Sequence, residues 1–219
     1  MLQWSLCKEI VLLFTKRSSK AGFITGFFVL VFLVIISGLD ECGRGSLAGP
    51  LVGALAIIHC EIEEFLTRLN TPLRDSKKLT EKQRLSIYHL KDHLPITYAI
   101  ESISVEDINA KGIAWANQEV FLRLVNRVQS DHYLIDGNLK FTDPRVESVI
   151  KGDNLHPQIM LASVIAKVYR DQLMSDLHNL YPQYSWHQNS GYGSTAHQMA
   201  IKEHGPTLHH RTLFIRRFV

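Results

Sequence analysis

Short apolar runs recur along the chain and predict the strands of a sheet. Continuous apolar residues over about 31–39 and 51–58 are typical of strands buried on both faces, and the tight turn between them predicts a hairpin. Residues 96–103 alternate between apolar and polar side chains, as a strand with one buried face does. Two shorter runs, 132–136 and 146–151, are each stopped by a glycine and predict two further strands.

Capping signals and helical spacing predict helices between these strands. A capping box that begins at Thr80 predicts a helix over about 81–94, and a similar signal predicts a second helix over about 105–128. A third helix, over about 157–180, starts with a proline and has apolar positions close to the helical period. Because strands and helices alternate after a hairpin, the predicted fold class is α/β, a mixed sheet flanked by helices with a small C-terminal helical appendage.

The N-terminal part of the chain has an unusual composition. Residues 21–39 contain no charged side chain and follow a basic stretch, a pattern that by itself is typical of a membrane anchor or a signal peptide. However, the first strand of the sheet needs residues 31–39, and no small-residue cleavage site precedes Asp40. We therefore interpret residues 1–30 as an extension and 31–219 as the folded domain. A membrane-tethered form, in contact with lipid only through residues 21–39, is the alternative.

Net charge and cysteine content exclude only a few classes of protein. The net charge is +3, with 13 basic and 16 acidic side chains over residues 40–150, and 7 basic and 4 acidic over residues 151–219. An acidic centre followed by a basic third is compatible with a metal site beside a phosphate-binding surface, and equally with ordinary scatter. Three cysteines without paired spacing argue against a disulfide framework and a zinc cluster. We expect a reducing compartment, and hence a cytoplasmic location.

Three aspartates occur in one recurring context. Asp40, Asp136 and Asp153 each stand at or just beyond the end of a short apolar strand, and Glu41 adjoins the first. Strand ends form the usual crevice for chemistry in α/β sheets, and carboxylates gathered there repel one another without cations. Oxygen-only ligands favour Mg²⁺ or Mn²⁺, and two such ions roughly 4 Å apart support phosphodiester hydrolysis. The alternative is that these residues are turn or capping aspartates.

The segments around these acids resemble a known family. Residues 38–50 (GLDECGRGSLAGP) closely resemble the opening motif of ribonuclease HII, a type 2 ribonuclease H. Further matches follow in the family's order: DSKKL at 75–79, IDGN at 135–138, KGD at 151–153, the helix that contains ASVIAKV at 162–168 with Arg170-Asp171, GYG at 191–193, and Gly205-Pro206 with His210-Arg211. The resemblance covers about residues 33–214. Each of these motif matches is weak evidence by itself, but their occurrence in the family's order makes the set specific.

The resemblance implies a ribonuclease H-like fold and a catalytic role for residues 31–219. It implies that Asp40, Glu41, Asp136 and Asp153 are catalytic and bind two divalent ions, Mg²⁺ or Mn²⁺. The implied activity is endonucleolytic hydrolysis of the RNA strand of RNA–DNA hybrids, with nicking on the 5′ side of single ribonucleotides in duplex DNA. We expect a monomer whose partners are these nucleic acids. The alternatives are a nuclease or strand-transfer enzyme on the same fold, and a non-catalytic nucleic-acid binder.

The resemblance also implies a set of substrate-binding residues. Gly43-Arg44-Gly45 would contact the 2′-hydroxyl and flanking phosphates, because glycines admit close approach of backbone amides and arginine offers a fork for phosphate. Tyr192 would stack on the next sugar, or else be a core aromatic. Lys77 would contact phosphate or be a solvated lysine. Ser163 and Lys167, one helical turn apart, would present a phosphate-binding face or a plain helix surface. Against the family pattern, Ser190 stands where lysine is usual.

Overall fold

The computed structural model describes residues 11–14, 28–31, 34–69 and 71–219, which fall into two units, Met1–Ile35 and Ile36–Val219. In the first unit, strands β1 (Val11–Phe14) and β2 (Phe28–Val31) pair antiparallel, with Val11 opposite Val31. The predicted extension over residues 1–30 falls largely on residues outside the described ones. It therefore stays a prediction.

The second unit is built on a five-stranded mixed sheet. Its strands are β3 (Ile36–Cys42), β4 (Leu51–Ile58), β5 (Ile96–Ile103), β6 (His132–Asp136) and β7 (Val146–Val149). Their order is β5-β4-β3-β6-β7, antiparallel from β5 to β3 and parallel from β3 to β7. The predicted hairpin of the first two strands is confirmed, and the parallel half places the C-terminal ends of β3, β6 and β7 along one edge.

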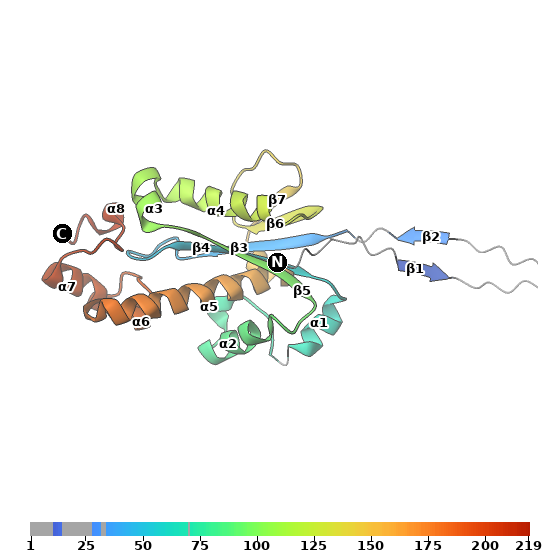
Figure 1. Ribbon diagram of the computed structural model, residues 1–219, viewed down its shortest axis with the longest axis horizontal. Helices are drawn as coiled ribbons and strands as arrows, with labels where there is room; N and C mark the ends of the chain where they lie inside the picture. Colours follow the sequence, from blue (N-terminus) through green and yellow to red (C-terminus); the bar gives the residue numbers. More distant parts are fainter. Residues whose placement is uncertain (1–10, 15–27, 32–33, 70) are drawn as a thin grey trace, which may run out of the picture. The chain divides into compact units, whose positions relative to one another are not determined.

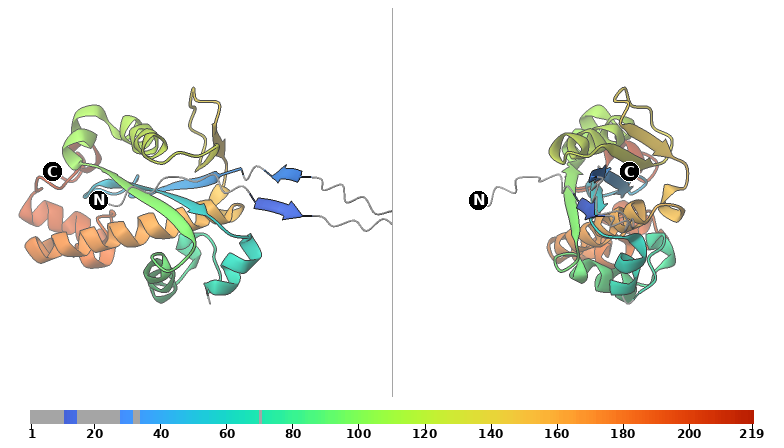
Figure 2. Two further views of the ribbon diagram at one scale, coloured as in Figure 1. Left: turned by 45° about the vertical axis from the view of Figure 1, so that its right-hand side comes forward. Right: turned by 90° about the vertical axis from the view of Figure 1, so that its right-hand side faces the viewer.

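Helices cover both faces of this sheet (Figures 1 and 2). Helix α4 (Ile113–Arg127) lies on one face, and α5 (Pro157–Leu180) with α2 (Glu81–Leu90) lies on the other. The α5 side of β4 presents Val52, Ala54 and Ala56, which pack with buried residues of α5 such as Leu161 and Ile165. Small side chains on the strand let the long helix lie close to the sheet. Short helices lie in the connections between these elements: α1 (Ile62–Arg68), η1 (Ser76–Lys78), α3 (Val105–Lys111) and η2 (Gly152–Asn154).

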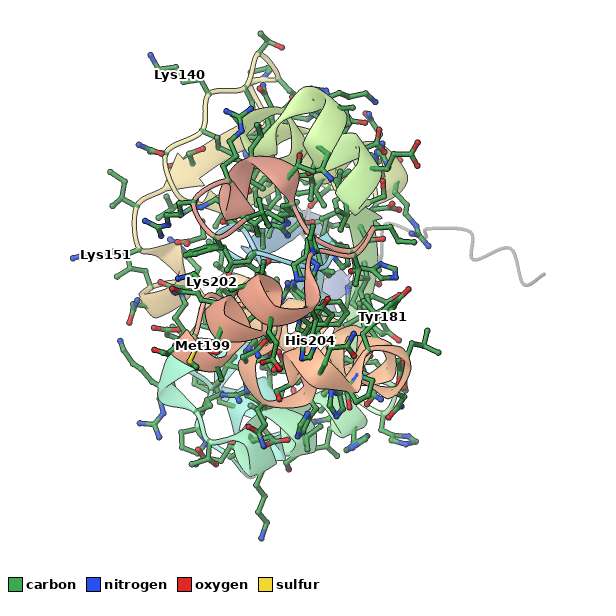
Figure 3. The ribbon with its side chains drawn as sticks, turned by 90° about the vertical axis from the view of Figure 1, so that its left-hand side faces the viewer. Lys140, Lys151, Tyr181, Met199, Lys202 and His204 are labelled. Carbon is green, nitrogen blue, oxygen red and sulfur yellow. The ribbon has the colours of Figure 1, made fainter. Side chains whose placement is uncertain are left out.

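The predicted C-terminal helical appendage is confirmed. It contains η3 (Pro182–Tyr184), α6 (Trp186–Asn189), α7 (Thr195–His204) and α8 (Thr212–Ile215). Its buried side chains, among them Tyr184, Trp186 and Ile201, pack on Leu47 and Ala48, which follow strand β3. The outer face of α7 carries the exposed side chains Met199, Lys202 and His204 (Figure 3). The appendage is thus anchored beside the end of β3 where Asp40 and Glu41 stand.

Several predicted boundaries were wrong, for reasons that lie in strand pairing and backbone conformation. The strand expected over 31–39 runs from Ile36 to Cys42, because only those residues pair with β4 and β6. The helix expected over 105–128 is interrupted at Gly112, whose φ of 87° and ψ of 160° are not helical. The helix expected to reach residue 94 ends at Leu90, and the strand expected to reach 151 ends at Val149. Helix α1 was not predicted.

The apolar stretch 21–39 is only partly described, since residues 21–27 and 32–33 lie outside the described ones. Its described residues contribute to β2 and β3. Among the residues that the structure describes, no helix is long and apolar enough to cross a membrane.

Candidate active site

Strand register brings two of the predicted acids side by side. Leu39 of β3 pairs with Ile135 of the parallel strand β6, so the next residues, Asp40 and Asp136, meet at the C-terminal ends of both strands. Asp40 is buried, and its carboxyl oxygen accepts the backbone N–H of Glu41 at 2.7 Å and a hydrogen bond from the Ser163 side chain on α5. The Asp40 carboxylate is thus held by a backbone N–H of β3 and by a side chain of α5.

Asp153 follows a tight turn after β7 and lies beside Asp136. Lys151 adopts a left-handed conformation with φ of 59°, which turns the chain back into η2. The backbone N–H of Asp153 then points to Oδ1 of Asp136 at 3.4 Å, and Nδ2 of Asn154 donates to Oδ1 of Asp153 at 2.7 Å. The three aspartates that the sequence predicted to gather at strand ends are therefore brought together, with Glu41 next to them.

Crowding of these acids shifts their protonation toward the neutral form. Burial raises the pKa of Asp40 well above its ordinary value, and the neighbouring charge of Glu41 raises it further. Burial also raises the pKa of Glu41, opposed by Arg44 and reinforced by Asp136. The pKa of Asp153 is raised by burial, then by the charge of Asp136. A cation bound between the carboxylates would stabilise their charged forms and so counteract each of these increases in pKa.

The donor set suits a hard divalent cation in its chemistry. A pocket of about 250 Å³ is lined by these residues: Asp40, Glu41, Arg44, Lys77, Asp136, Gly137, Asn138 and Ile150. Oxygen ligands without thiolate or imidazole favour Mg²⁺ or Mn²⁺. Within the described ranges, no three His, Cys, Asp or Glu side chains converge closely enough to hold one ion as they stand. The residues therefore fit such ions by ligand type, and ligation would draw the carboxylates inward.

The predicted Gly43-Arg44-Gly45 turn lies beside the acids, directly after β3. Gly43 has φ of +95°, and a Cβ there would stand 2.1 Å from Nε of Arg170, so only glycine fits. Arg44 is exposed and pairs with Glu41 at 3.2 Å, whereas a Cβ at Gly45 would meet nothing within 4 Å. The turn thus has an open side, with an exposed guanidinium next to the carboxylates.

Tyr192 lies against this turn rather than in the core. Its side chain is 37% exposed, its hydroxyl hydrogen-bonds with the Cys42 side chain and the Gly43 backbone, and burial raises its pKa to about 12. The Arg170 guanidinium lies 5.4 Å from the ring centroid. An aromatic ring with a neutral hydroxyl therefore borders the open turn.

The remaining predicted contacts are spread around the pocket. Lys77 lines it and is exposed. Ser163 is buried, and its hydroxyl lies 2.9 Å from that of Ser76, so it supports Asp40 rather than forming an open helix surface. Lys167 is partly exposed and pairs with Asp171 at 2.7 Å, 5.9 Å from the Tyr192 ring. Of these three residues, only Lys77 lines the pocket, whereas Ser163 contacts Asp40 from the buried side.

Three supporting residues were given no role by sequence reasoning. Arg170 and Arg211 are fully buried, and both donate to carbonyl groups of the loop that follows the turn, Arg170 to Ala48 at 3.0 Å and Arg211 to Gly49 at 2.8 Å. Asp75 is buried, accepts the Lys77 backbone N–H at 2.9 Å, and its charge raises the pKa of Asp153. An arginine inside the apolar part of a helix was the available signal for Arg170.

Comparison with known proteins identifies the class. A family model described as ribonuclease HII matches residues 37–217. Ribonuclease HII of Rickettsia bellii (strain OSU 85-389) is 39% identical over 186 residues, which cover 83% of this chain and 90% of that protein. The structure of ribonuclease H2 from Pyrococcus horikoshii OT3 matches with a TM-score of 0.69 at 24% identity, over 84% of this chain and 97% of that one. The structure of Bst ribonuclease HIII in complex with Mn²⁺ matches with a TM-score of 0.63 at 18% identity, over 84% of this chain and 69% of that one.

The fold is therefore ribonuclease H-like, and the enzyme is an endoribonuclease of the ribonuclease H class. The chain belongs to the ribonuclease HII family. The predicted resemblance, fold class and RNA–DNA hybrid endonuclease activity are thereby confirmed.

Proposed function

We propose that this ribonuclease H also nicks duplex DNA on the 5′ side of single embedded ribonucleotides, using divalent metal ions bound by Asp40, Glu41, Asp136 and Asp153. The observation that carries the proposal is the position of the Gly43-Arg44-Gly45 turn. It places open backbone and an exposed guanidinium beside the carboxylates, with the Tyr192 ring on its flank. The 2′-hydroxyl is what distinguishes one ribonucleotide from its DNA neighbours, so recognition of a single one needs such a contact.

The carboxylates would hold two Mg²⁺ or Mn²⁺ ions. When bound, a pair of such ions activates water and stabilises the leaving oxygen in phosphodiester hydrolysis. Support comes from the oxygen-only donor set and from the Mn²⁺ complex of the structurally similar Bst ribonuclease HIII. The Ser163 hydroxyl and the Glu41 backbone hold Asp40 in a fixed orientation, and the Asp153 N–H does the same for Asp136.

The substrate would lie across the turn and the pocket. Arg44 and Lys77 are exposed cations that can approach phosphates flanking the cleaved bond, and Lys167 lies further along, near Tyr192. The glycines on either side of Arg44 allow backbone groups to reach the 2′-hydroxyl. Tyr192 would stack on the sugar of the next nucleotide, so that a ribonucleotide–DNA junction is read. We further propose that the enzyme works as a monomer in a reducing cytoplasmic compartment, consistent with Cys42 and Cys60 being free thiols.

The test is a cleavage assay on three end-labelled duplexes: all DNA, DNA with one ribonucleotide, and an RNA–DNA hybrid. Each is incubated with Mg²⁺, with Mn²⁺ or with chelator. A nick on the 5′ side of the lone ribonucleotide that chelator abolishes is the expected result. Cleavage of the hybrid alone would remove the role proposed for Tyr192 and the turn. Cleavage of all-DNA duplex would favour a nuclease without the 2′-hydroxyl requirement, and metal-independent binding without turnover would favour a non-catalytic binder.

A further inference from the structure

A buried chain of hydrogen bonds connects the C-terminal appendage to the backbone of Tyr192. His197 of α7 and His210 are both fully buried, with their Nε2 atoms 3.2 Å apart. Trp186 Nε1 donates to Nε2 of His197 at 3.0 Å, and Nδ1 of His197 lies 2.9 Å from the carbonyl oxygen of Tyr192. These hydrogen bonds thus connect the Trp186 indole and the two histidine rings to the backbone of Tyr192, whose ring is proposed to stack on a sugar.

The partners of these rings fix where each proton sits. The Thr207 backbone N–H donates to Nδ1 of His210 at 2.9 Å, so a neutral His210 carries its proton on Nε2 and donates it toward His197. Nε2 of His197 accepts from Trp186, so a neutral His197 carries its proton on Nδ1. That proton is donated to the Tyr192 carbonyl, a group that can only accept. With these tautomers each ring N–H faces an acceptor, and Nε2 of His197 shares its single lone pair between Trp186 at 3.0 Å and His210 at 3.2 Å.

Tyr192 needs such a restraint because glycines flank it on both sides. Its peptide is tied by its N–H to the Asn189 carbonyl at 2.8 Å and by its carbonyl to the Ser194 N–H at 2.9 Å. Those two bonds are local. On the N-terminal side of Tyr192, the Gly191 carbonyl also accepts the Leu47 and Ala48 N–H groups at 2.8 and 3.2 Å, so the turn is anchored there, and the Tyr192 carbonyl is the group that His197 holds on the C-terminal side. His197 adds the connection to the buried aromatic cluster of the appendage, which is itself packed on Leu47 and Ala48. The ring can then stay in place beside Gly43.

We propose that His197 is a positioning residue that, through the proton on Nδ1, holds the Tyr192 backbone so that its ring meets the sugar at the ribonucleotide–DNA junction. This inference rests on the proposed function, in which Tyr192 reads that junction. His197 does not touch the substrate. Trp186 alone is sufficient to keep Nε2 of His197 as an acceptor, so His210 reinforces the arrangement and is less critical than His197.

The test uses a matched pair of substitutions at one position. Asparagine places its amide where Nδ1 of histidine stands, and glutamine places its amide where Nε2 stands. His197→Asn therefore keeps the donor to the Tyr192 carbonyl and loses the contact with Trp186, whereas His197→Gln does the reverse. The kcat/KM of each variant is measured on the single-ribonucleotide duplex and on the RNA–DNA hybrid, with Tyr192→Ala as the reference for loss of the ring.

We expect His197→Gln to lose about tenfold or more of its kcat/KM on the single-ribonucleotide duplex relative to the hybrid, because small displacements of positioning groups carry large penalties. His197→Asn should keep the wild-type ratio between the two substrates, even if both variants melt at lower temperature. Equal ratios in the two variants would overturn the inference. If Tyr192→Ala also keeps the wild-type ratio, the proposed reading of the junction fails instead, which separates the two ideas.

A second measurement applies to the wild-type enzyme and needs no variant to fold. Nitrogen-15 spectra of histidine-labelled protein at neutral pH report which ring nitrogen carries the proton. The inference requires the Nδ1-protonated tautomer at His197 and the Nε2-protonated tautomer at His210. The opposite tautomer at His197 would leave the Tyr192 carbonyl without this donor and would overturn the proposal.

Discussion

Arg170 and Arg211 hold the carbonyl oxygens of adjacent residues, Ala48 and Gly49, from buried positions in different segments. Arg211 also donates to the Arg44 carbonyl at 3.1 Å, inside the turn proposed to contact the 2′-hydroxyl. Burial lowers the pKa of Arg211 to about 9, so it stays charged at neutral pH. Among the described residues, neither arginine forms an ion pair with a carboxylate. Backbone carbonyls accept from both guanidinium groups, and the Ser46 hydroxyl also accepts from Arg170 at 2.8 Å.

Arg211→Lys should lower stability and activity together. Lysine keeps the charge but cannot span the Gly49 and Arg44 carbonyls as the guanidinium fork does. Loss of charged hydrogen bonds to buried carbonyls should reduce the free energy of unfolding by about 2–4 kcal/mol. Urea unfolding measures the change, with the exposed Arg216→Lys as control. A stability equal to that of the control would show that the fork does not hold this loop.

Asp136→Asn should abolish turnover while leaving substrate binding measurable. The carboxylate stands beside Asp40 at the strand ends, and the amide keeps its shape but loses the negative charge that a divalent cation needs. Cleavage rate and binding to a labelled hybrid are measured separately. Asp176→Asn, on the exposed part of α5, is the matched control and should cleave normally. Full activity in Asp136→Asn would exclude it from the catalytic set.

Gly43→Ala should damage the turn more than an equal backbone change elsewhere. Both Gly43 and Gly112 have positive φ, 95° and 87°, so alanine is strained by about 1 kcal/mol at either position. Only at Gly43 does the added Cβ collide with Arg170. We expect Gly43→Ala to lose most of its activity on the single-ribonucleotide duplex and Gly112→Ala to keep it. Equal activities in the two variants would show that the collision has no consequence for the site.

Stability should fall in acid through the buried histidine pair. Burial, together with the neighbouring charges of His197 and His209, lowers the pKa of His210 from 6.5 to about 4. In the unfolded chain His210 therefore binds a proton near pH 6.5, whereas in the folded chain it binds this proton only near pH 4. The stabilising contribution is full above pH 6.5 and is lost as the pH falls toward 4, on the order of 1–2 kcal/mol.

Urea unfolding of wild type and His210→Gln between pH 8 and pH 4.5 checks this expectation. The difference between the two curves isolates the histidine, because the buried acids, whose pKa values are raised, contribute with the opposite sign in both proteins. The stability advantage of the wild type should shrink as the pH falls. A difference that is constant with pH would mean that His210 does not titrate in this way.

Much of the site could be predicted from local patterns. The acids Asp40, Asp136 and Asp153 each follow a recognisable apolar strand, and parallel strands necessarily bring such ends together. The break at Gly112 could not be predicted from spacing, because apolar periodicity continues on both sides of it. Neither could the start of β3, because the apolar run extends well beyond the residues that find a pairing partner.

The sequence by itself determined the α/β alternation, the motifs around the acids and the family, because periodicity and motif order are properties of the linear chain. Only the tertiary structure decided what supports the site. Arg170 and Arg211 converge on one loop although they are far apart in sequence, and His197 meets Trp186, His210 and the Tyr192 carbonyl in one buried place. Such contacts depend on how the C-terminal helices pack against the end of β3. Hydrogen-bond partners of buried polar groups are chosen by that packing, and no local pattern encodes them.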